Sequence, residues 1–389
     1  MANKKRRKKK KKGVNIALFV IEIVVLIVLV VGIFAFAKIN RSLNENLGTD
    51  LAGQVANDNT DDVVINTEVA KNERLTGYTN IALVGIDTRE QDIDYANSDT
   101  MLVASINNDT WGVRMISLYR DTYLNINPDS EEGNFNKANA AYAFGSVNQF
   151  LSMLNANLDL NITQYVIVDF NAVATLIDDL GGINITLTEQ EVVHLNNYCV
   201  ETAEVTGMPY TPLEYDEGME AREYTLNGVQ GVSYARIRYT EGNDPKRTQR
   251  QRLVIQKIVE KAKGKGLASV TAIIEDVFPK VKTNFTSSQL IKMASQMFNY
   301  NIEYTSGFPF EHLETDIGEL DAVVPVTLAE NVSELHAFLF DDTNYQVSQA
   351  VKAYSDRIVA DSGFGESYRN SAIENGKVPD TGSEADLAR

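Results

Sequence analysis

Arginines gather in one short stretch, Arg236–Arg252, of an otherwise acidic chain. Arg236 and Arg238 are two residues apart, so they share a face if this part is extended. Arg247 and Gln251 are four residues apart, so they share a face if their part is helical. A guanidinium group offers planar paired donors that match phosphate oxygens. The stretch therefore indicates a clamp for a diphosphate; the alternative is a solvated helix face whose arginines pair with acidic neighbours.

Carboxylates fall where predicted strands end. Apolar runs predict strands over Tyr78–Ile86, Thr100–Ile106 and Gly112–Leu118. If neighbouring strands run antiparallel, one edge of the sheet collects four charged residues, namely Asp87, Asp99, Arg120 and Asp121. Two carboxylates at one edge suit Mg²⁺, which is usually held by one or two carboxylates and substrate phosphates. The alternative is that Asp87 and Asp99 are turn residues, because Asp side chains bond nearby backbone N–H groups.

Three further side chains have a functional and a structural interpretation. Lys137 opens a predicted helix, where its ammonium group could reach the same site, or it is a surface lysine. Tyr142 and Tyr239 could line a pocket, but packing in the core is the favoured interpretation.

The elements that must position these residues alternate irregularly. Helices are predicted over Ala138–Leu154, Phe170–Leu180 and Pro245–Lys263, with Gly145 as a weak point in the first. A strand is predicted over Gln164–Asp169. Together with the early hairpin, this order predicts an α/β fold, a single mixed-sheet α/β/α layered domain rather than a parallel doubly wound sheet.

The N-terminus indicates a membrane anchor. The chain has 389 residues and a net charge of −17, yet Lys4–Lys12 contains only basic residues. The segment Val14–Lys38 that follows is apolar apart from a few residues and long enough to span a bilayer. Basic residues favour the cytoplasmic side. The sequence therefore predicts a single-pass cell-membrane protein with a cytoplasmic tail (1–13), a transmembrane helix (14–38) and an extracellular body.

Composition divides the body and excludes several functions. A polar linker is expected over residues 39–74, a catalytic domain over 75–330, and a C-terminal extension with a polar tail over 331–389. The acidic body argues against nucleic-acid binding. One cysteine, Cys199, excludes an intramolecular disulfide framework and a cysteine-rich zinc site, and three histidines leave little material for a histidine-based metal site.

Six stretches, in order along the chain, resemble the LytR-CpsA-Psr family of cell-wall glycopolymer ligases. They are Asn80–Glu90, Ser98–Asn107, Ile116–Ile126, Asn136–Gly145, Tyr165–Leu187 and Ala235–Ile255. The resemblance implies transfer of an anionic glycopolymer, of the teichoic acid or capsular polysaccharide type, from a polyprenyl-diphosphate carrier to peptidoglycan. The product link is then a phosphodiester. The single span and external domain also match the family layout.

The resemblance also implies roles for individual residues. Asp87 and Asp99 would hold Mg²⁺, with Mn²⁺ as an alternative. The diphosphate-binding positions match Arg120, Arg236, Arg238, Arg247 and Gln251, while Lys137 and Asp244 match other positions of the same pocket. Asp121 is the nearest candidate for a general base on the acceptor hydroxyl, beside Arg120. The polyprenyl chain needs an apolar groove, expected between the sheet and the helices around Ala138–Leu154 and Phe170–Leu180.

The sequence departs from the family pattern at one position, and two functions other than the transferase are also compatible with it. Where the family usually has proline before the Arg-Asp pair, this chain has Tyr119, which keeps its N–H for the sheet. A polyprenyl-diphosphate hydrolase would use the same metal and arginines, with water in place of the sugar hydroxyl. A membrane-anchored protein that only binds the lipid carrier, or regulates, would need the arginines and not the carboxylates.

Overall fold

The computed structural model describes residues 60–86, 98–237, 243–263, 280–285 and 300–365, with single positions at 265, 273, 276–277, 289 and 368. The predicted cytoplasmic tail and transmembrane helix lie outside the described residues. No helix within the described ranges is both long and apolar enough to cross a membrane.

A six-stranded mixed sheet forms the centre of the molecule. Its strands lie in the order β10 (Asn301–Phe308), β3 (Gly112–Leu118), β2 (Ser98–Asn107), β1 (Tyr78–Ile86), β6 (Gln164–Asp169) and β9 (Val281–Thr283). β1 runs antiparallel to β2 and parallel to β6, and β10 runs parallel to β3. The predicted bounds of β1, β3 and β6 are confirmed, as is the antiparallel arrangement of the first three strands.

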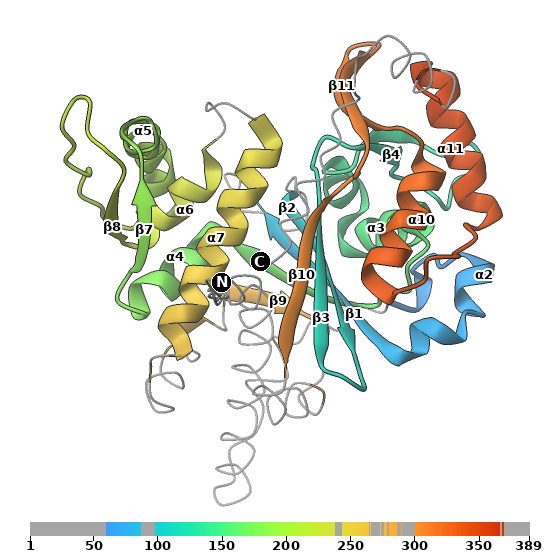
Figure 1. The fold of residues 1–389 in the computed structure, drawn as a ribbon, viewed down its shortest axis with the longest axis horizontal. Helices are drawn as coiled ribbons and strands as arrows, with labels where there is room; N and C mark the ends of the chain where they lie inside the picture. The colour runs from blue at the N-terminus through green and yellow to red at the C-terminus, as the bar shows by residue number, and fades with distance from the viewer. Residues whose placement is uncertain are drawn as a thin grey trace, which may run out of the picture.

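Helices cover both faces of this sheet, so the predicted α/β/α layering is confirmed. Figure 1 shows α4 (Phe170–Asp179), α5 (Glu189–Thr206), α6 (Gly228–Arg236) and α7 (Asn243–Lys263) on one side of the sheet, and α3 (Ala140–Leu158), α10 (Leu328–Phe340) and α11 (Gln349–Ser362) on the other. Successive residues of β1 face opposite layers: Leu83 packs on the α4–α7 side, and Ala82 and Val84 on the α3 side. Burial of both faces explains why the strands read as continuous apolar runs.

Three short two-stranded ribbons lie outside the central sheet among the described residues. They are β4 (Tyr123–Asn125) with β5 (Phe135–Lys137), β7 (Ile183–Leu187) with β8 (Arg222–Leu226), and β11 (His312–Ile317) with β12 (Leu320–Pro325). The β4–β5 ribbon follows β3 in the chain and carries two of the predicted site residues at its ends, Asp121 just before β4 and Lys137 in β5.

Part of the predicted linker is folded against the domain. Residues 60–77 form η2 (Thr60–Asp62), α2 (Thr67–Ala70) and η3 (Glu73–Gly77), and the side chains of Val69 and Leu75 are buried. The amide of Asn66 donates to the carbonyl oxygen of Ala156, 3.0 Å away, at the end of α3. Within the linker predicted for 39–74, the stretch from residue 60 onward therefore belongs to the folded unit.

Candidate functional site

A pocket of about 750 Å³ lies between the sheet and the helices α4 to α7. One wall is apolar and is built by strand residues Leu83, Leu102 and Val166 together with Val254 and Ile258 of α7. The apolar wall lies beside α4, one of the two helices expected to border a lipid groove. The other helix, α3, packs on the opposite face of the sheet and does not border this pocket. That the pocket is a lipid groove stays a prediction.

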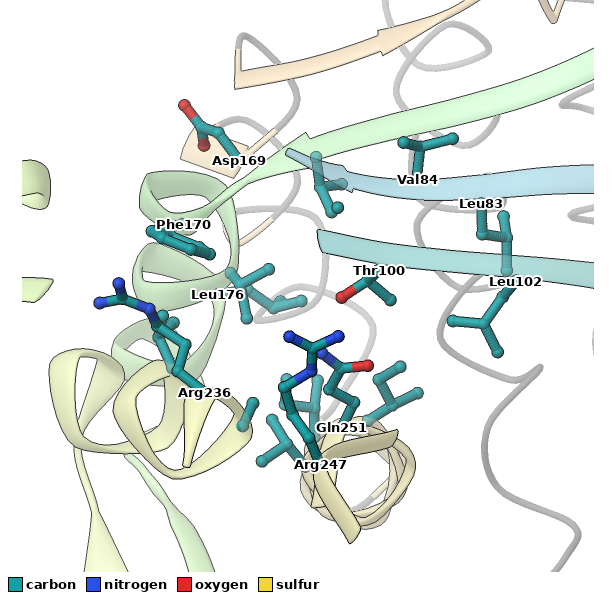
Figure 2. Close-up of a pocket in the computed structure, with 18 of the residues that line it drawn as sticks. Leu83, Val84, Thr100, Leu102, Asp169, Phe170, Leu176, Arg236, Arg247 and Gln251 are labelled. Carbon is teal, nitrogen blue, oxygen red and sulfur yellow. The ribbon is translucent and has the colours of Figure 1, made fainter. Parts of the chain in front are cut away.

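Polar side chains line the other part of the pocket. Arg236 ends α6, while Arg247 and Gln251 lie one turn apart on α7. Figure 2 shows Arg247 and Gln251 extending from α7 toward Thr100 in β2, and Arg236 extending toward Phe170 at the start of α4. The structure therefore brings together four of the predicted diphosphate-binding residues in one pocket, since Arg120 lines it as well.

Arg236 is held on several sides. Its guanidinium donates to Oε2 of Glu201 and to Oγ1 of Thr202, both at 2.8 Å, from the neighbouring helix α5. The same group lies 4.7 Å from the ring centre of Phe170 and 5.6 Å from that of Tyr198. These contacts fix the direction of the guanidinium group at the pocket wall.

The arginines of α7 make different contacts although they are close in sequence. Arg247 is 3% exposed and lines the pocket. Arg250 instead donates to Oε1 of Glu191 at 3.2 Å and to the carbonyl oxygen of Ile237 at 3.3 Å. Arg252 donates to Oγ of Ser117 in β3 at 3.3 Å. Arg250 and Arg252 therefore join α7 to its neighbours. Arg250 pairs with an acidic residue, as the structural alternative expects, but it is buried and does not lie on a solvated face.

Arg120, Asp121 and Lys137 form a charged cluster beside the pocket. Nε of Arg120 lies 3.2 Å from Oδ2 of Asp121, and Nζ of Lys137 lies 3.5 Å from Oδ1 of the same carboxylate. Backbone hydrogen bonds join the two segments, because Asn139 N donates to the Arg120 carbonyl at 3.0 Å. Arg120 lines the pocket, whereas Asp121 and Lys137 are not among its lining residues.

Tyr119, at the position where the family usually has proline, uses the N–H that proline lacks. Its N–H donates to the carbonyl oxygen of Phe308 in β10 at 2.9 Å. The side chain is buried against His312, with ring centres 5.2 Å apart. The expectation that Tyr119 keeps its N–H for the sheet is confirmed.

Sequence reasoning missed several pocket residues. Asp169 ends β6, lines the pocket and caps α4 by accepting a hydrogen bond from Ala172 N at 2.7 Å. Burial raises the pKa of this carboxyl group. His194, Tyr198 and Glu201 line the pocket from α5 at spacings of four and three residues, which is the signal of one helix face.

Other predicted positions are outside what the structure describes. These are Asp87, Arg238 and Tyr239, and the side chains of Asp99 and Asp244. Among the described side chains, no group of three His, Cys, Asp or Glu residues is placed to hold a metal ion. The metal site therefore stays a prediction.

Two further residues singled out in the sequence lie in the core. Tyr142 is fully buried, as expected. Cys199 is buried as well, and burial raises the pKa of its thiol to about 11.

Comparison with known proteins gives consistent results. The sequence model of the LytR_cpsA_psr family matches residues 44–316. The chain is 29% identical over 231 residues to the polyisoprenyl-teichoic acid–peptidoglycan teichoic acid transferase TagU of Enterococcus faecalis, covering 59% of this chain and 66% of that protein. It is 30% identical over 210 residues to TagU of Bacillus subtilis, covering 53% of this chain and 60% of that one. The chain thus matches less than two thirds of the length of either relative.

Solved structures share the fold. The crystal structure of protein gbs0355 from Streptococcus agalactiae superposes with a TM-score of 0.57 at 22% identity. The match covers 72% of this chain and 93% of that one. At this identity the likeness establishes the fold.

Proposed function

Because the chain belongs to the LytR_cpsA_psr family, we propose that it is a transferase that moves an anionic glycopolymer from a polyprenyl-diphosphate carrier to peptidoglycan. The glycopolymer is of the teichoic acid or capsular polysaccharide type. The two curated relatives described above are named as teichoic acid transferases, which supports the teichoic acid class.

The observation that carries this proposal is the division of the pocket into two chemical parts. A polyprenyl diphosphate has a long apolar tail and a highly charged head. The apolar wall around Leu83, Leu102 and Val254 suits the tail, because burying it removes apolar surface from water. Arg120 and Arg247, at the polar part, suit the head, because guanidinium groups match phosphate oxygens.

The reaction is a displacement at phosphorus. An acceptor hydroxyl of peptidoglycan attacks the phosphorus atom that carries the glycan, and the bond from this atom to the bridging oxygen breaks. Polyprenyl phosphate leaves, and the glycan becomes joined by a phosphodiester. Charge gathers on the leaving oxygen, so fixed donors such as Arg120 and Arg247 favour the transition state. We assign Asp121 as the base that accepts the hydroxyl proton.

A divalent cation completes the proposal. Asp87 and Asp99 are the residues proposed to hold Mg²⁺ or Mn²⁺, since two carboxylates together with substrate phosphate oxygens suit such an ion. The ion would neutralise charge on the diphosphate. The support for this part is the strand pairing: Ile86, which precedes Asp87, pairs with Ser98, which precedes Asp99. Because of this pairing, we propose that the two carboxylates meet at this end of β1 and β2.

The proposed location follows from the apolar segment 14–38 and the basic run before it. One helix would anchor the chain in the cell membrane, with the N-terminus cytoplasmic and the domain outside. This arrangement would place the pocket on the side where peptidoglycan lies and near the lipid carrier.

The test uses the purified full chain in lipid nanodiscs, a polyprenyl-diphosphate-linked glycan and peptidoglycan oligomers, with Mg²⁺ or a chelator. Glycan joined to peptidoglycan, lost with the chelator and in Asp99→Ala and Arg120→Ala, is the expected result. Free glycan phosphate without an acceptor product would instead establish a hydrolase. Lipid binding without turnover, unchanged by Asp99→Ala, would establish a carrier-binding protein.

A further inference from the structure

The C-terminal part of the domain contacts the segments that carry the charged cluster of Arg120, Asp121 and Lys137. The family match ends at residue 316, whereas β12 and α11 follow it. Both elements touch the segments that carry Asp121 and Lys137. We propose that β12 and α11 are a brace that positions the Asp121–Lys137 pair. This inference rests on the proposed function for its catalytic meaning, but its structural part can be tested separately.

The first contact is a backbone bond. The N–H of Val323 in β12 donates to the carbonyl oxygen of Asp121 at 2.9 Å, and Thr122 forms an isolated parallel bridge with Val323. In an antiparallel pair, alternate residues direct their N–H groups away from the partner strand. Val323 and Pro325 are two residues apart in β12, so both occupy positions whose backbone nitrogen points away from β11. Proline, which has no N–H, fits such a position. The Val323 N–H therefore serves Asp121 and is not part of the β11–β12 ladder.

The second contact is the packing of α11 on the β4–β5 ribbon. Tyr354 of α11 lies edge-on to Phe135 of β5, with ring centres 5.9 Å apart. The guanidinium of Arg357 lies 5.6 Å from the centre of the same ring. Tyr123, which pairs with Lys137 in the ribbon, donates its hydroxyl to Oδ2 of Asp361 at 3.2 Å. Both strands of the ribbon are thus fixed from outside by one helix.

These contacts converge on the same two residues from opposite ends. β12 fixes the backbone of Asp121, and α11 fixes the strands that pair Tyr123 with Lys137. The Lys137–Asp121 distance of 3.5 Å depends on the relative position of these two strands. Val323 and Tyr354 are therefore positioning residues: neither lines the pocket, and each acts through a neighbour.

The experiment uses two variant pairs of the full chain. Val323→Pro removes the backbone N–H that bonds Asp121. Val323→Ala shortens the side chain and keeps this N–H. Tyr354→Ala removes the ring from Phe135, while Tyr354→Phe keeps the ring. Asp356→Ala, on the exposed face of α11, is a further control. Transfer kinetics, binding of farnesyl diphosphate and amide hydrogen exchange are measured for each variant.

We expect Val323→Pro and Tyr354→Ala to lower kcat about tenfold or more, because small displacements of catalytic groups are costly. Farnesyl diphosphate binding stays unchanged, and amide exchange becomes faster in 121–125 and 135–139 but not in α4 or α7. Val323→Ala and Asp356→Ala behave like the parent. Tyr354→Phe keeps the ring but loses the hydrogen bond between the Tyr354 hydroxyl and Asn125 of β4, so its change is much smaller than that of Tyr354→Ala.

Three results would overturn the brace. One is unchanged exchange in 121–125 and 135–139. Another is faster exchange there with unchanged kcat. The last is an equal rise of exchange in α4 and α7, which would indicate general loss of stability. If the parent itself shows no transfer, the proposed function fails, and selective exchange in the two segments still decides whether the brace exists.

Discussion

Arg236 and Glu201 face each other across the wall of the pocket, with Nη2 of the arginine 2.8 Å from Oε2 of the glutamate. The Glu201 carboxylate therefore forms an ion pair with a guanidinium group that is also predicted to bind the diphosphate. Because Thr202, Phe170 and Tyr198 also contact Arg236, its guanidinium does not depend on Glu201 alone for its position.

Glu201→Gln is expected to tighten diphosphate binding. The substitution keeps a hydrogen-bond acceptor for Arg236 and removes a negative charge that repels the ligand. Glu201 is 39% exposed, so solvent screens the pair, and a gain of about two- to fivefold in affinity is expected. Titration with farnesyl diphosphate at low and high salt measures it, and the gain should shrink as salt rises. Glu204→Gln, on an exposed position of α5, is the control; weaker binding in Glu201→Gln alone would contradict the prediction.

Arg247 and Arg250 are expected to separate ligand binding from stability. Arg247→Gln should lower the affinity for farnesyl diphosphate about tenfold or more, because hydrogen bonds to charged groups contribute about 1.5 to 3 kcal/mol. Arg250→Gln should instead lower the free energy of unfolding by a similar amount, because it leaves the Glu191 carboxylate without its guanidinium partner. Calorimetric titration and urea unfolding of both variants give the comparison. If the two variants lose affinity and stability in the same proportion, the assignment of separate roles is wrong.

Much of the sheet could be predicted from the sequence because both of its faces are buried. β1, β3 and β6 are short apolar runs ended by polar or turn residues, and their bounds were predicted correctly. α5 escaped prediction because its buried face includes Thr202 and Thr206, which reads as polar. Thr206 satisfies its hydroxyl within the helix by donating to the Thr202 carbonyl at 2.8 Å. Polar side chains that form hydrogen bonds within their own helix can be buried, and they then interrupt the helical spacing of apolar residues from which a helix is predicted.

The site was predicted only as far as residue type allowed. Arginine spacing indicated that Arg247 and Gln251 share a face of one helix, and both line the pocket. It could not tell which arginines of α7 face the pocket, since this depends on where α5 places Glu191. The contribution of α5 to the pocket and the contact of Val323 with Asp121 depend on long-range packing and left no local signal.

Gly307→Ala is expected to disturb the segment that carries Arg120. A Cβ atom at Gly307 would lie 2.3 Å from the hydroxyl oxygen of Tyr119 and 2.7 Å from Cζ of its ring, so the buried ring must move. We expect a loss of about 1 to 3 kcal/mol in the free energy of unfolding, typical of an overpacked core, together with weaker transfer. In a Tyr119→Ala background the same change should cost much less, since the two sites are coupled. Equal costs in both backgrounds, measured by urea unfolding, would show that Tyr119 is not the group displaced.

His336 is expected to make the folded domain sensitive to acid. The ring is fully buried, stacks on Tyr345 with ring centres 3.5 Å apart, and places Nε2 3.1 Å from the Leu158 carbonyl oxygen. Burial lowers the pKa of His336 to about 4 from its ordinary value of 6.5. The unfolded chain therefore binds a proton at a higher pH than the folded one, so stability is lost as pH falls from about 6.5 toward 4. Between neutral pH and pH 5 this loss should be about 2 kcal/mol.

The measurement for His336 compares urea unfolding of the parent and of His336→Phe from pH 7.5 down to pH 4.5. Phenylalanine keeps a flat ring for Tyr345 and cannot take up a proton, but it leaves the Leu158 carbonyl without its donor. The variant should therefore be less stable at neutral pH, and the gap should narrow as the pH falls. His312→Phe, which removes another buried histidine, is the control. A gap between parent and His336→Phe that stays constant across this range would mean that His336 is not the group that titrates, and that the acid sensitivity has another source.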